Sequence, residues 1–189
     1  MQVKIIAFGA ALSVAPGLLH AQFDFHVAER EVQVHSFASQ GLMYSNQNNY
    51  MTMKTSSGSF AMTDVGVNIS TQITDKFRVG AQIYDRSFGR LSQWHPTLDF
   101  AYGDYRLKDW LGIRAGKVKT AMGLYNELQD NQSLYTFAML PQSVYPTDLR
   151  DATVGHIGAD LYGNIPIKNL GAFSYTVYGG RRRDTRYGG

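Results

Sequence analysis

Polar and charged side chains of the kinds that attract or repel small ions recur in several segments of this chain. Arg78, Arg86 and Arg114 alternate with apolar neighbours, while Glu127 and Asp130 fall in a polar stretch further along. Fixed charges in a narrow passage sort ions by sign, because partial loss of water strengthens each contact. The candidate residues are Arg78, Gln82, Arg86, Arg114, Lys117, Lys119, Glu127 and Asp130. Each of them also has a simpler interpretation, as a solvated group on a wet surface.

The patterns that would indicate catalysis or metal binding are missing from the sequence. The stretch 112–117 (GIRAGK) lacks the spacing of a phosphate-binding loop and the Ser or Thr that follows its lysine. The histidines show no metal-ligand spacing, and no Gly-x-Ser-x-Gly turn occurs. The chain has no cysteine, which excludes disulfides, thiolate metal sites and cysteine nucleophiles. We therefore expect no enzyme, no catalytic residue, no metal site and no cofactor.

The hairpin 61–86 carries the clearest structural pattern. Its first strand alternates apolar residues, such as Val65, Val67 and Ile69, with polar or small ones, and the alternation resumes after a turn at 74–76. Strict alternation over about ten residues or more indicates a strand whose two faces meet different surroundings. Globular strands usually have about 5–6 residues, whereas a tilted strand that crosses a membrane needs about 9–11.

Further strand-like segments follow the same pattern, and their connections alternate between short turns and long polar loops. These segments are 32–44, with a bulge expected near Ser36, and 97–107, 111–116, 153–162 and 171–178. Bacterial outer-membrane barrels show the same asymmetry of connections. The sequence therefore predicts an all-β fold, an antiparallel up-and-down transmembrane β-barrel, here with about seven strands. In this register Lys117 and Lys119 share a face with Ile113, so they join Arg114 only if the strand ends or bulges by Lys117.

The N-terminus has the features of a secretory signal peptide. Lys4 precedes an apolar run from Ile5 to Val14, and cleavage after Ala21 would remove residues 1–21. The alternative is an amphipathic first helix or a buried segment. Residues 22–31 are interpreted as a polar leader, and no stretch is long and apolar enough for a membrane-spanning helix. The formal net charge of +3 is too small to indicate a nucleic-acid partner.

Three motifs resemble sequences of a known family. They are Val34–Gly41 (VHSFASQG), Gly116–Glu127 (GKVKTAMGLYNE) and Leu140–Pro146 (LPQSVYP). Over about residues 32–165 the chain resembles the bacterial outer-membrane porin superfamily, in particular the phosphate-selective-porin-like and related uncharacterised porins. It departs from them at Ala121, where proline is frequent.

The resemblance implies a barrel of 16–18 strands, often a homotrimer, whose third extracellular loop folds inward and narrows the pore. That loop would span about residues 122–149, so Glu127, Asp130 and Asp148 would face the wall arginines. About seven strands cannot close in lipid, because an open edge leaves backbone groups unpaired. Residues 32–189 are therefore expected to be the N-terminal portion of a larger barrel.

The expected function is passive diffusion of small hydrophilic solutes or ions through a water-filled pore, in the cell outer membrane of a Gram-negative bacterium after export by the signal peptide. The expected partners are outer-membrane lipid, lipopolysaccharide, the solutes and further copies of the chain. Two alternatives remain: a structural or adhesive outer-membrane barrel with a plugged interior, and a secreted β-barrel that binds a ligand inside, as lipocalins do.

Overall fold

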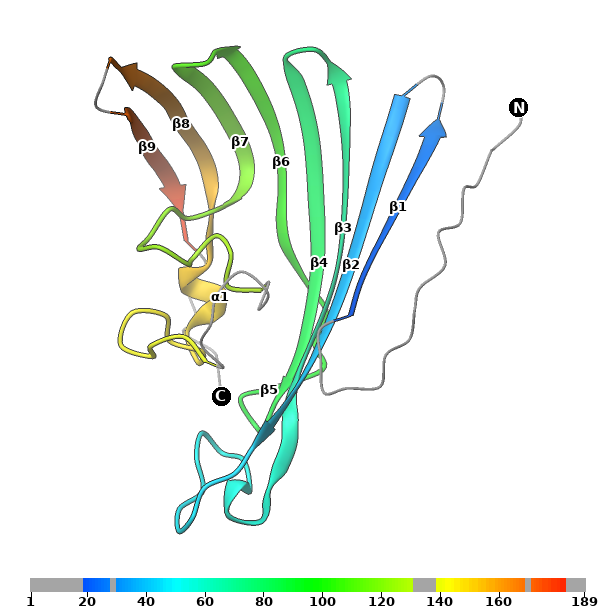
Figure 1. Cartoon of the computed structure of the whole chain (residues 1–189), viewed down its shortest axis with the longest axis vertical. Coiled ribbons are helices and arrows are strands. Elements are labelled where there is room, and N and C mark those ends of the chain that lie inside the picture. The colour runs from blue at the N-terminus through cyan, green and yellow to red at the C-terminus, as the bar shows by residue number, and fades with distance from the viewer. Residues whose placement is uncertain (1–18, 28–29, 131–138, 169–170, 183–189) are drawn as a thin grey trace.

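The computed structural model describes residues 19–27, 30–130, 139–168 and 171–182, and these form one antiparallel up-and-down sheet (Figure 1). The strands are β1 (Leu19–Val27), β2 (Arg30–Met43), β3 (Ser59–Thr74), β4 (Phe77–Phe88), β5 (Ser92–Gln93), β6 (Thr97–Lys108), β7 (Leu111–Lys119), β8 (Gly155–Ile167) and β9 (Gly171–Arg181). Their order is β1-β2-β3-β4-β6-β7-β8-β9, and the short β5 pairs with β4. The all-β, antiparallel up-and-down prediction is confirmed. The sheet is not closed: within the described residues, β1 and β9 each pair along one edge only.

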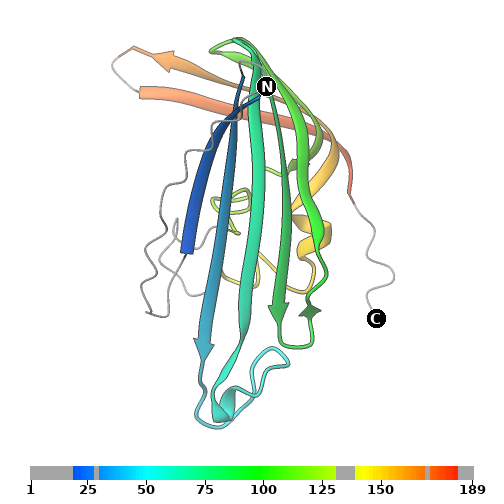
Figure 2. The same cartoon turned by 90° about the vertical axis from the view of Figure 1, so that its right-hand side faces the viewer.

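Two short helical pieces interrupt the loops, η1 (Thr55–Ser57) and α1 (Arg150–Thr153). No helix in the described part of the chain is long and apolar enough to cross a membrane. The connections at one end of the sheet are short, as at 75–76 and 109–110, whereas those at the other end are long (Figure 1). Figure 2 shows the twist and curvature of the sheet from the side.

The two faces of the sheet differ in chemistry, as the hairpin pattern predicts. The face against which residues 120–130 and 139–154 pack is called the inner face, and its rows hold residues such as Asn68, Gln82 and Tyr84. The opposite, outer face presents large apolar side chains to the surroundings: Val67 is 50% exposed and Ile83 57%. Other exposed apolar residues in its rows are Ile69, Ile113, Ile157, Leu161, Ile165, Phe173 and Val177.

The segment expected as a polar leader, 22–31, contains most of strand β1 and the start of β2. Strand β1 pairs with β2 from Leu19↔Ala38 to Val27↔Arg30, so it begins inside the segment 1–21 interpreted as a signal peptide. Its residues alternate: Phe23 and Phe25 lie on the outer face, and Asp24 points to the inner face. This is the same period of two as in the hairpin, in a run that is more polar on one side. Residues 1–18 lie outside the described residues, so the signal peptide stays a prediction.

The bulge expected near Ser36 is wrong. The pairing of β2 with β3 runs without interruption from Val32 to Gly41, and the register shifts only between Gly41 and Met43. The expectation arose because Phe37 has the opposite parity to Val32 and Val34. In the structure the Phe37 ring lies on the inner face over Gly66, where a Cβ atom would come within 2.3 Å of the ring. An aromatic residue fits on the polar face because the glycine opposite it leaves room.

Strands β8 and β9 approach each other closely at paired glycines. Gly158 pairs with Gly180, and a Cβ atom on Gly158 would lie 2.1 Å from the carbonyl oxygen of Gly179. Gly179 itself has open space, with nothing within 4 Å of the corresponding position. Glycine at 158 therefore permits a backbone contact that any side chain would block.

Candidate functional site

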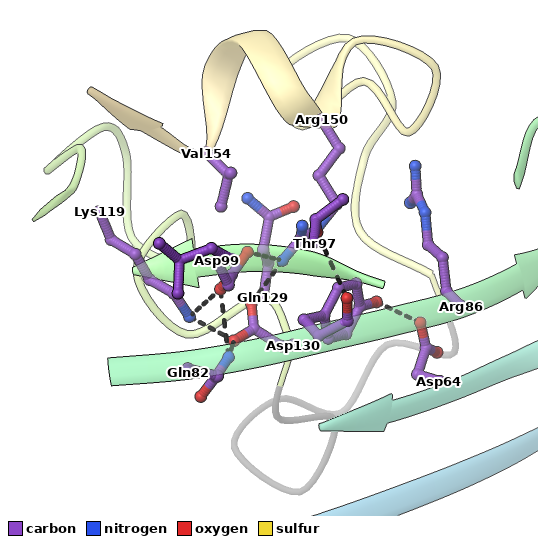
Figure 3. A network of polar contacts seen from close by, with 12 residues as sticks. Asp64, Gln82, Arg86, Thr97, Asp99, Lys119, Gln129, Asp130, Arg150 and Val154 are labelled. Carbon is purple, nitrogen blue, oxygen red and sulfur yellow. Dashed lines mark hydrogen bonds and ion pairs between the residues drawn. The ribbon is translucent and has the colours of Figure 1, made fainter. Parts of the chain in front are cut away.

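A buried cluster of two acids and two bases fixes the segment between β7 and β8 to the inner face (Figure 3). Arg150 contacts the Asp99 carboxylate at 2.9 Å and the Asp130 carboxylate at 3.0 Å. Lys119 contacts Asp99 at 3.2 Å and also pairs with Asp130. Gln82 donates from its side-chain amide to Asp99 at 3.1 Å and to Asp130 at 2.6 Å. The charges within the cluster balance, two against two.

The members of this cluster come from both the sheet and the segment. Gln82, Asp99 and Lys119 belong to β4, β6 and β7, whereas Asp130 and Arg150 belong to the segment. Asp99 is only 1% exposed and Arg150 only 4%. Buried charges are costly unless they are paired and hydrogen-bonded, and the geometry here provides both. The segment is therefore held to the sheet by directional contacts of Asp130 and Arg150.

The guanidinium of Arg150 also extends the cluster toward β3. It lies 4.0 Å from the centre of the Tyr84 ring, a cation–π distance, and the Tyr84 hydroxyl donates to Asp64. Ser39 donates to the same carboxylate at 3.2 Å. Figure 3 labels Arg150 and Asp64, the two ends of this line of contacts. It connects the segment to β2, β3 and β4 through side chains that are all buried.

The charges within the cluster favour the ionised forms of Asp130 and Arg150. Burial opposes ionisation of Asp130, but the charges of Lys119 and Arg150 outweigh it and lower the pKa of this carboxyl below its ordinary value. Burial likewise opposes the charge of Arg150, while Asp99, Tyr84 and Asp130 raise the pKa of the guanidinium above its ordinary value. Both groups are therefore charged at neutral pH.

Asn126 joins the two ends of the segment, Thr120 and Val154, where the chain leaves β7 and returns to β8; this junction is called the neck. Its amide nitrogen donates to the carbonyl oxygens of Thr120 at 2.8 Å, Thr153 at 3.2 Å and Val154 at 3.3 Å. The backbone N–H of Thr120 donates to the carbonyl oxygen of Val154 at 2.9 Å. Asn126 is 1% exposed and Thr120 is fully buried. The chain therefore enters and leaves the segment through one hydrogen-bonded pair.

Tyr145 and Arg86 add two further attachments. The Tyr145 hydroxyl accepts from the backbone N–H groups of Leu124 at 2.9 Å and Tyr125 at 3.0 Å. These bonds connect the two described stretches of the segment, 120–130 and 139–154. Arg86 donates from its guanidinium to the carbonyl oxygen of Thr147 at 2.6 Å. Residues 131–138 of the expected loop 122–149 lie outside the described residues.

A second polar group lies on the inner face of β6, β7 and β8. Arg114 pairs with Asp104 at 3.2 Å and lies over the rings of Tyr102 (4.7 Å) and Tyr162 (5.2 Å). The Tyr162 hydroxyl donates to Asp104, and Glu127 approaches Arg114 at 3.9 Å. These contacts hold the Arg114 guanidinium against the sheet between two aromatic rings. Asp104 and Glu127 partly neutralise its charge.

His156 is buried beneath the neck of the segment. Its Nε2 lies 2.8 Å from Asp160 and its Nδ1 lies 3.1 Å from the Thr120 hydroxyl, and its ring lies against Tyr178. A hydroxyl, an imidazole and a carboxylate in this order resemble the arrangement of a hydrolytic triad. Thr120, however, has no exposed surface from which a substrate could be reached. The trio therefore serves to hold the neck in place.

Two cavities adjoin the docked segment. One of about 240 Å³ lies against β3, β4 and β6, with Arg78, Phe100 and Tyr102 among its lining residues. The other, of about 50 Å³, lies between β4 and the segment, where Arg86 and Tyr145 face it. Arg78 donates to Ser70 at 2.8 Å. Polar and aromatic groups thus line the space on both sides of the segment.

Most of the residues predicted from their spacing lie on the inner face. Gln82, Lys119 and Asp130 meet in the cluster, and the others contact the wall or the segment: Arg78, Arg86, Arg114 and Glu127. Lys117 is not brought to this site. Its row pairs it with Ala101 and Ile157 on the outer face, and its ammonium group donates to the carbonyl oxygen of Leu98.

The two lysines differ because β7 continues through Lys117 and ends at Lys119. The alternation therefore still holds at Lys117, whereas the chain turns inward directly after Lys119. Sequence reasoning also did not identify Asp99, Asn126, Tyr145 and Arg150. The sequence did contain a signal for Asp99, because the alternation of apolar and polar residues in 97–107 changes phase. In the structure Gln82 pairs with Phe100 and Ile83 with Leu98, so the register shifts at Asp99. Asp148, expected to oppose the arginines, lies in the exposed part of the segment.

Comparison with protein-family models, with curated proteins and with solved structures gives no match for this chain.

Proposed function

We propose that this chain forms part of the wall of an outer-membrane porin, a β-barrel through which small hydrophilic solutes or ions diffuse passively. No catalysis is involved: pore width and lining charge would set which solutes pass. The segment 120–154 would be the inward-folded loop that narrows the pore, held by the cluster of Asp99, Asp130, Lys119 and Arg150.

The observation that carries the proposal is the contrast between the two faces of the sheet. The outer face exposes Val67, Ile83 and Ile157 at 50%, 57% and 67%, while charged and amide groups gather on the inner face. In water such an apolar surface would favour aggregation, whereas in lipid it lies in its preferred solvent. A secreted ligand-binding barrel would have the opposite arrangement, with apolar residues inside.

Strand dimensions support the same proposal. The eight long strands have 9–16 residues, which suffices for the roughly 9–11 that a tilted membrane strand needs. A membrane barrel leaves no free edge, because unpaired backbone groups in lipid each cost several kcal/mol. We therefore propose that further strands, in a barrel of 16–18, pair with the free edges of β1 and β9. Export by an N-terminal signal peptide, contact with lipopolysaccharide and assembly as a homotrimer belong to the same proposal.

Reconstitution of the full-length protein, in which further strands complete the barrel, tests this function. The chain in detergent is incorporated into liposomes loaded with a small hydrophilic dye and into planar bilayers. The expected results are release of the small dye but not of a large dextran, and stepwise increases in conductance. A chain that is soluble and monomeric without detergent would overturn the membrane assignment. A chain that inserts but stays closed to solutes and ions would favour the structural or adhesive barrel instead.

A further inference from the structure

Five of the chain's seven methionines gather in one cluster at the end of the sheet with the long loops. Met53 and Met62 are buried, at 2% and 6% exposure, together with Phe88. Three more methionines pack against this centre from other parts of the chain: Met43, Met51 and Met139. The cluster is called the methionine cluster below. It draws on β2, the loop after it, β3 and the inward segment.

The composition of the methionine cluster is not that of an ordinary apolar core. Among the described residues, the side chains of this cluster other than the five methionines are Phe88 and Ala61. Methionine does fill irregular gaps in cores, but a core built for packing normally mixes it with branched residues. The thioether sulfur is what the five side chains share and what leucine or valine would not supply.

The loop that carries Met51 and Met53 is rigidly built. The Thr55 side chain is 1% exposed; its hydroxyl accepts from the backbone N–H of Tyr50 at 2.9 Å and lies 2.6 Å from the Ser45 hydroxyl. The backbone N–H of Ser45 in turn donates to the Thr55 carbonyl oxygen at 3.0 Å. These bonds fix both ends of the turn that presents the two methionines.

The same turn contains backbone strain. Met51 and Thr52 have φ angles of 47° and 64°, in the left-handed region, and Thr52 is β-branched. Such conformations cost free energy and persist where the surrounding structure enforces them, which is frequent at binding sites. Here the strain turns the chain so that Met51 and Met53 both pack into the cluster. Gly89 lies against them, at a position where a Cβ atom would come within 2.8 Å of the Met53 side chain.

We propose that the methionine cluster is a binding site for a soft monovalent metal ion, Cu(I) or Ag(I), held by thioether sulfurs. Met53 and Met62 would supply the two buried ligands, and at least one of Met43, Met51 and Met139 would complete the coordination. Soft sulfur ligands select Cu(I) over hard cations. The flexible methionine side chain lets neighbouring sulfurs turn toward one ion without movement of the backbone.

Charge argues for a monovalent rather than a divalent ion. All the ligands are neutral thioethers, and the Arg86 guanidinium lies 6.0 Å from the centre of the Phe88 ring at the edge of the cluster. Neutral ligands neutralise none of the charge of a buried ion, so a divalent ion would cost more to bury than a monovalent one. In the described residues, no group of three or more His, Cys, Asp and Glu side chains forms a site for Zn²⁺ or Cu²⁺. This inference is independent of the proposed pore, because it requires only the folded loop end.

The test measures binding of Ag(I), and of Cu(I) kept reduced with ascorbate, to the purified full-length chain in detergent, by competition with a chromophoric chelator. We expect one ion per chain and no competition by Zn²⁺. The double variant Met53→Leu/Met62→Leu removes both buried sulfurs with little change in volume, and it should weaken binding about tenfold or more. The control Met122→Leu changes a methionine outside the cluster and should leave the affinity unchanged.

A second measurement separates lost ligands from lost folding. With ¹³C-methyl-labelled methionine, Ag(I) should shift the signals of the cluster methionines and leave that of Met122 in place. Circular dichroism of the double variant should match that of the parent chain; if it does not, the single variant Met62→Leu replaces it in the binding assay. Absence of Ag(I) and Cu(I) binding, or equal affinity of the parent and the folded leucine variant, would overturn the proposal.

Discussion

Arg150 is the residue on which the position of the inward segment most depends. It contacts both carboxylates of the cluster and the face of the Tyr84 ring, and it is almost completely buried. A buried ion pair adds little net stability compared with apolar side chains, but removal of one partner leaves the other charge without compensation. Arg150 therefore acts less as a source of stability than as a specifier of one docked geometry.

Replacement of Arg150 tests this role. In Arg150→Met, the Asp99 and Asp130 carboxylates keep Lys119 as the positive charge of the cluster and Gln82 as a neutral donor, and the free energy of unfolding should fall by about 3–5 kcal/mol. Residues 139–149 should also become sensitive to protease under native conditions. Both are measured on the chain in detergent, by urea unfolding and by limited proteolysis. The control Arg90→Met alters an exposed loop arginine and should behave like the parent. Equal stability of the two variants would show that the cluster does not hold the segment.

Individual site residues could be predicted only where local spacing determined them. Alternation placed Gln82 and Arg86 on the inner face, and the structure agrees. It could not find Arg150, because the side chain reaches Asp99 across 51 positions of the sequence and depends on how the whole segment folds back. Lys117 was placed on the inner face on the condition that the strand ended or bulged by that residue. Strand β7 continues to Lys119, so Lys117 keeps the outer face that simple alternation gives it.

At the scale of strands, the period of two was a reliable guide to the hairpin and to most of the sheet. The predicted hairpin 61–86 corresponds to β3 and β4, with a turn at 75–76. Strand β1 was missed because its polar residues Gln22, Asp24 and His26 suggested a solvated leader, although they alternate with apolar ones. The length of β8 was underestimated, since its last residues, Gly163–Ile167, include a proline that normally argues against a strand.

Adjacent residues on β3 provide a direct test of which face meets lipid. Val67→Arg puts a charge on the exposed outer face, where an arginine near the middle of a bilayer costs about 2–4 kcal/mol. Asn68→Arg puts the same charge one position along, on the inner face. We expect the Val67 variant to insert poorly into liposomes and the Asn68 variant to insert normally, as measured by flotation. Similar insertion of both would contradict a lipid-facing outer surface.

For the molecule as a whole, the curvature of the sheet depends on places where strands come unusually close. Gly158 and Gly180 allow such an approach between β8 and β9, near the free edge of the sheet. Sheets curve where glycine or a bulge relieves crowding on one face. The register also shifts in the β2–β3, β3–β4, β4–β6 and β6–β7 pairs, so the bend is distributed over several strands.

A pair of neighbouring glycines tests whether this approach matters. Gly158→Ala would place a methyl group 2.1 Å from the Gly179 carbonyl oxygen, so β9 must move away, and stability should fall by about 1–3 kcal/mol. Gly179→Ala meets nothing within 4 Å and should change stability by about 0.5 kcal/mol or less. Urea unfolding gives the magnitude, and faster hydrogen exchange in β9 would locate the effect. A Gly158 variant as stable as the Gly179 variant would rule out a structural need for the contact.

The neck formed by Thr120, Val154 and Asn126 has a practical consequence for engineering. Because the chain leaves the sheet and returns to it at one hydrogen-bonded pair, the residues between that lie outside the charge cluster can be exchanged without altering the pairing of β7 with β8. A graft that keeps Asn126, Asp130, Arg150 and the two neck residues would carry a foreign recognition sequence on an unchanged scaffold. In the pore proposed above, the same scaffold would then present a set of different channel linings, as a nanopore sensor requires.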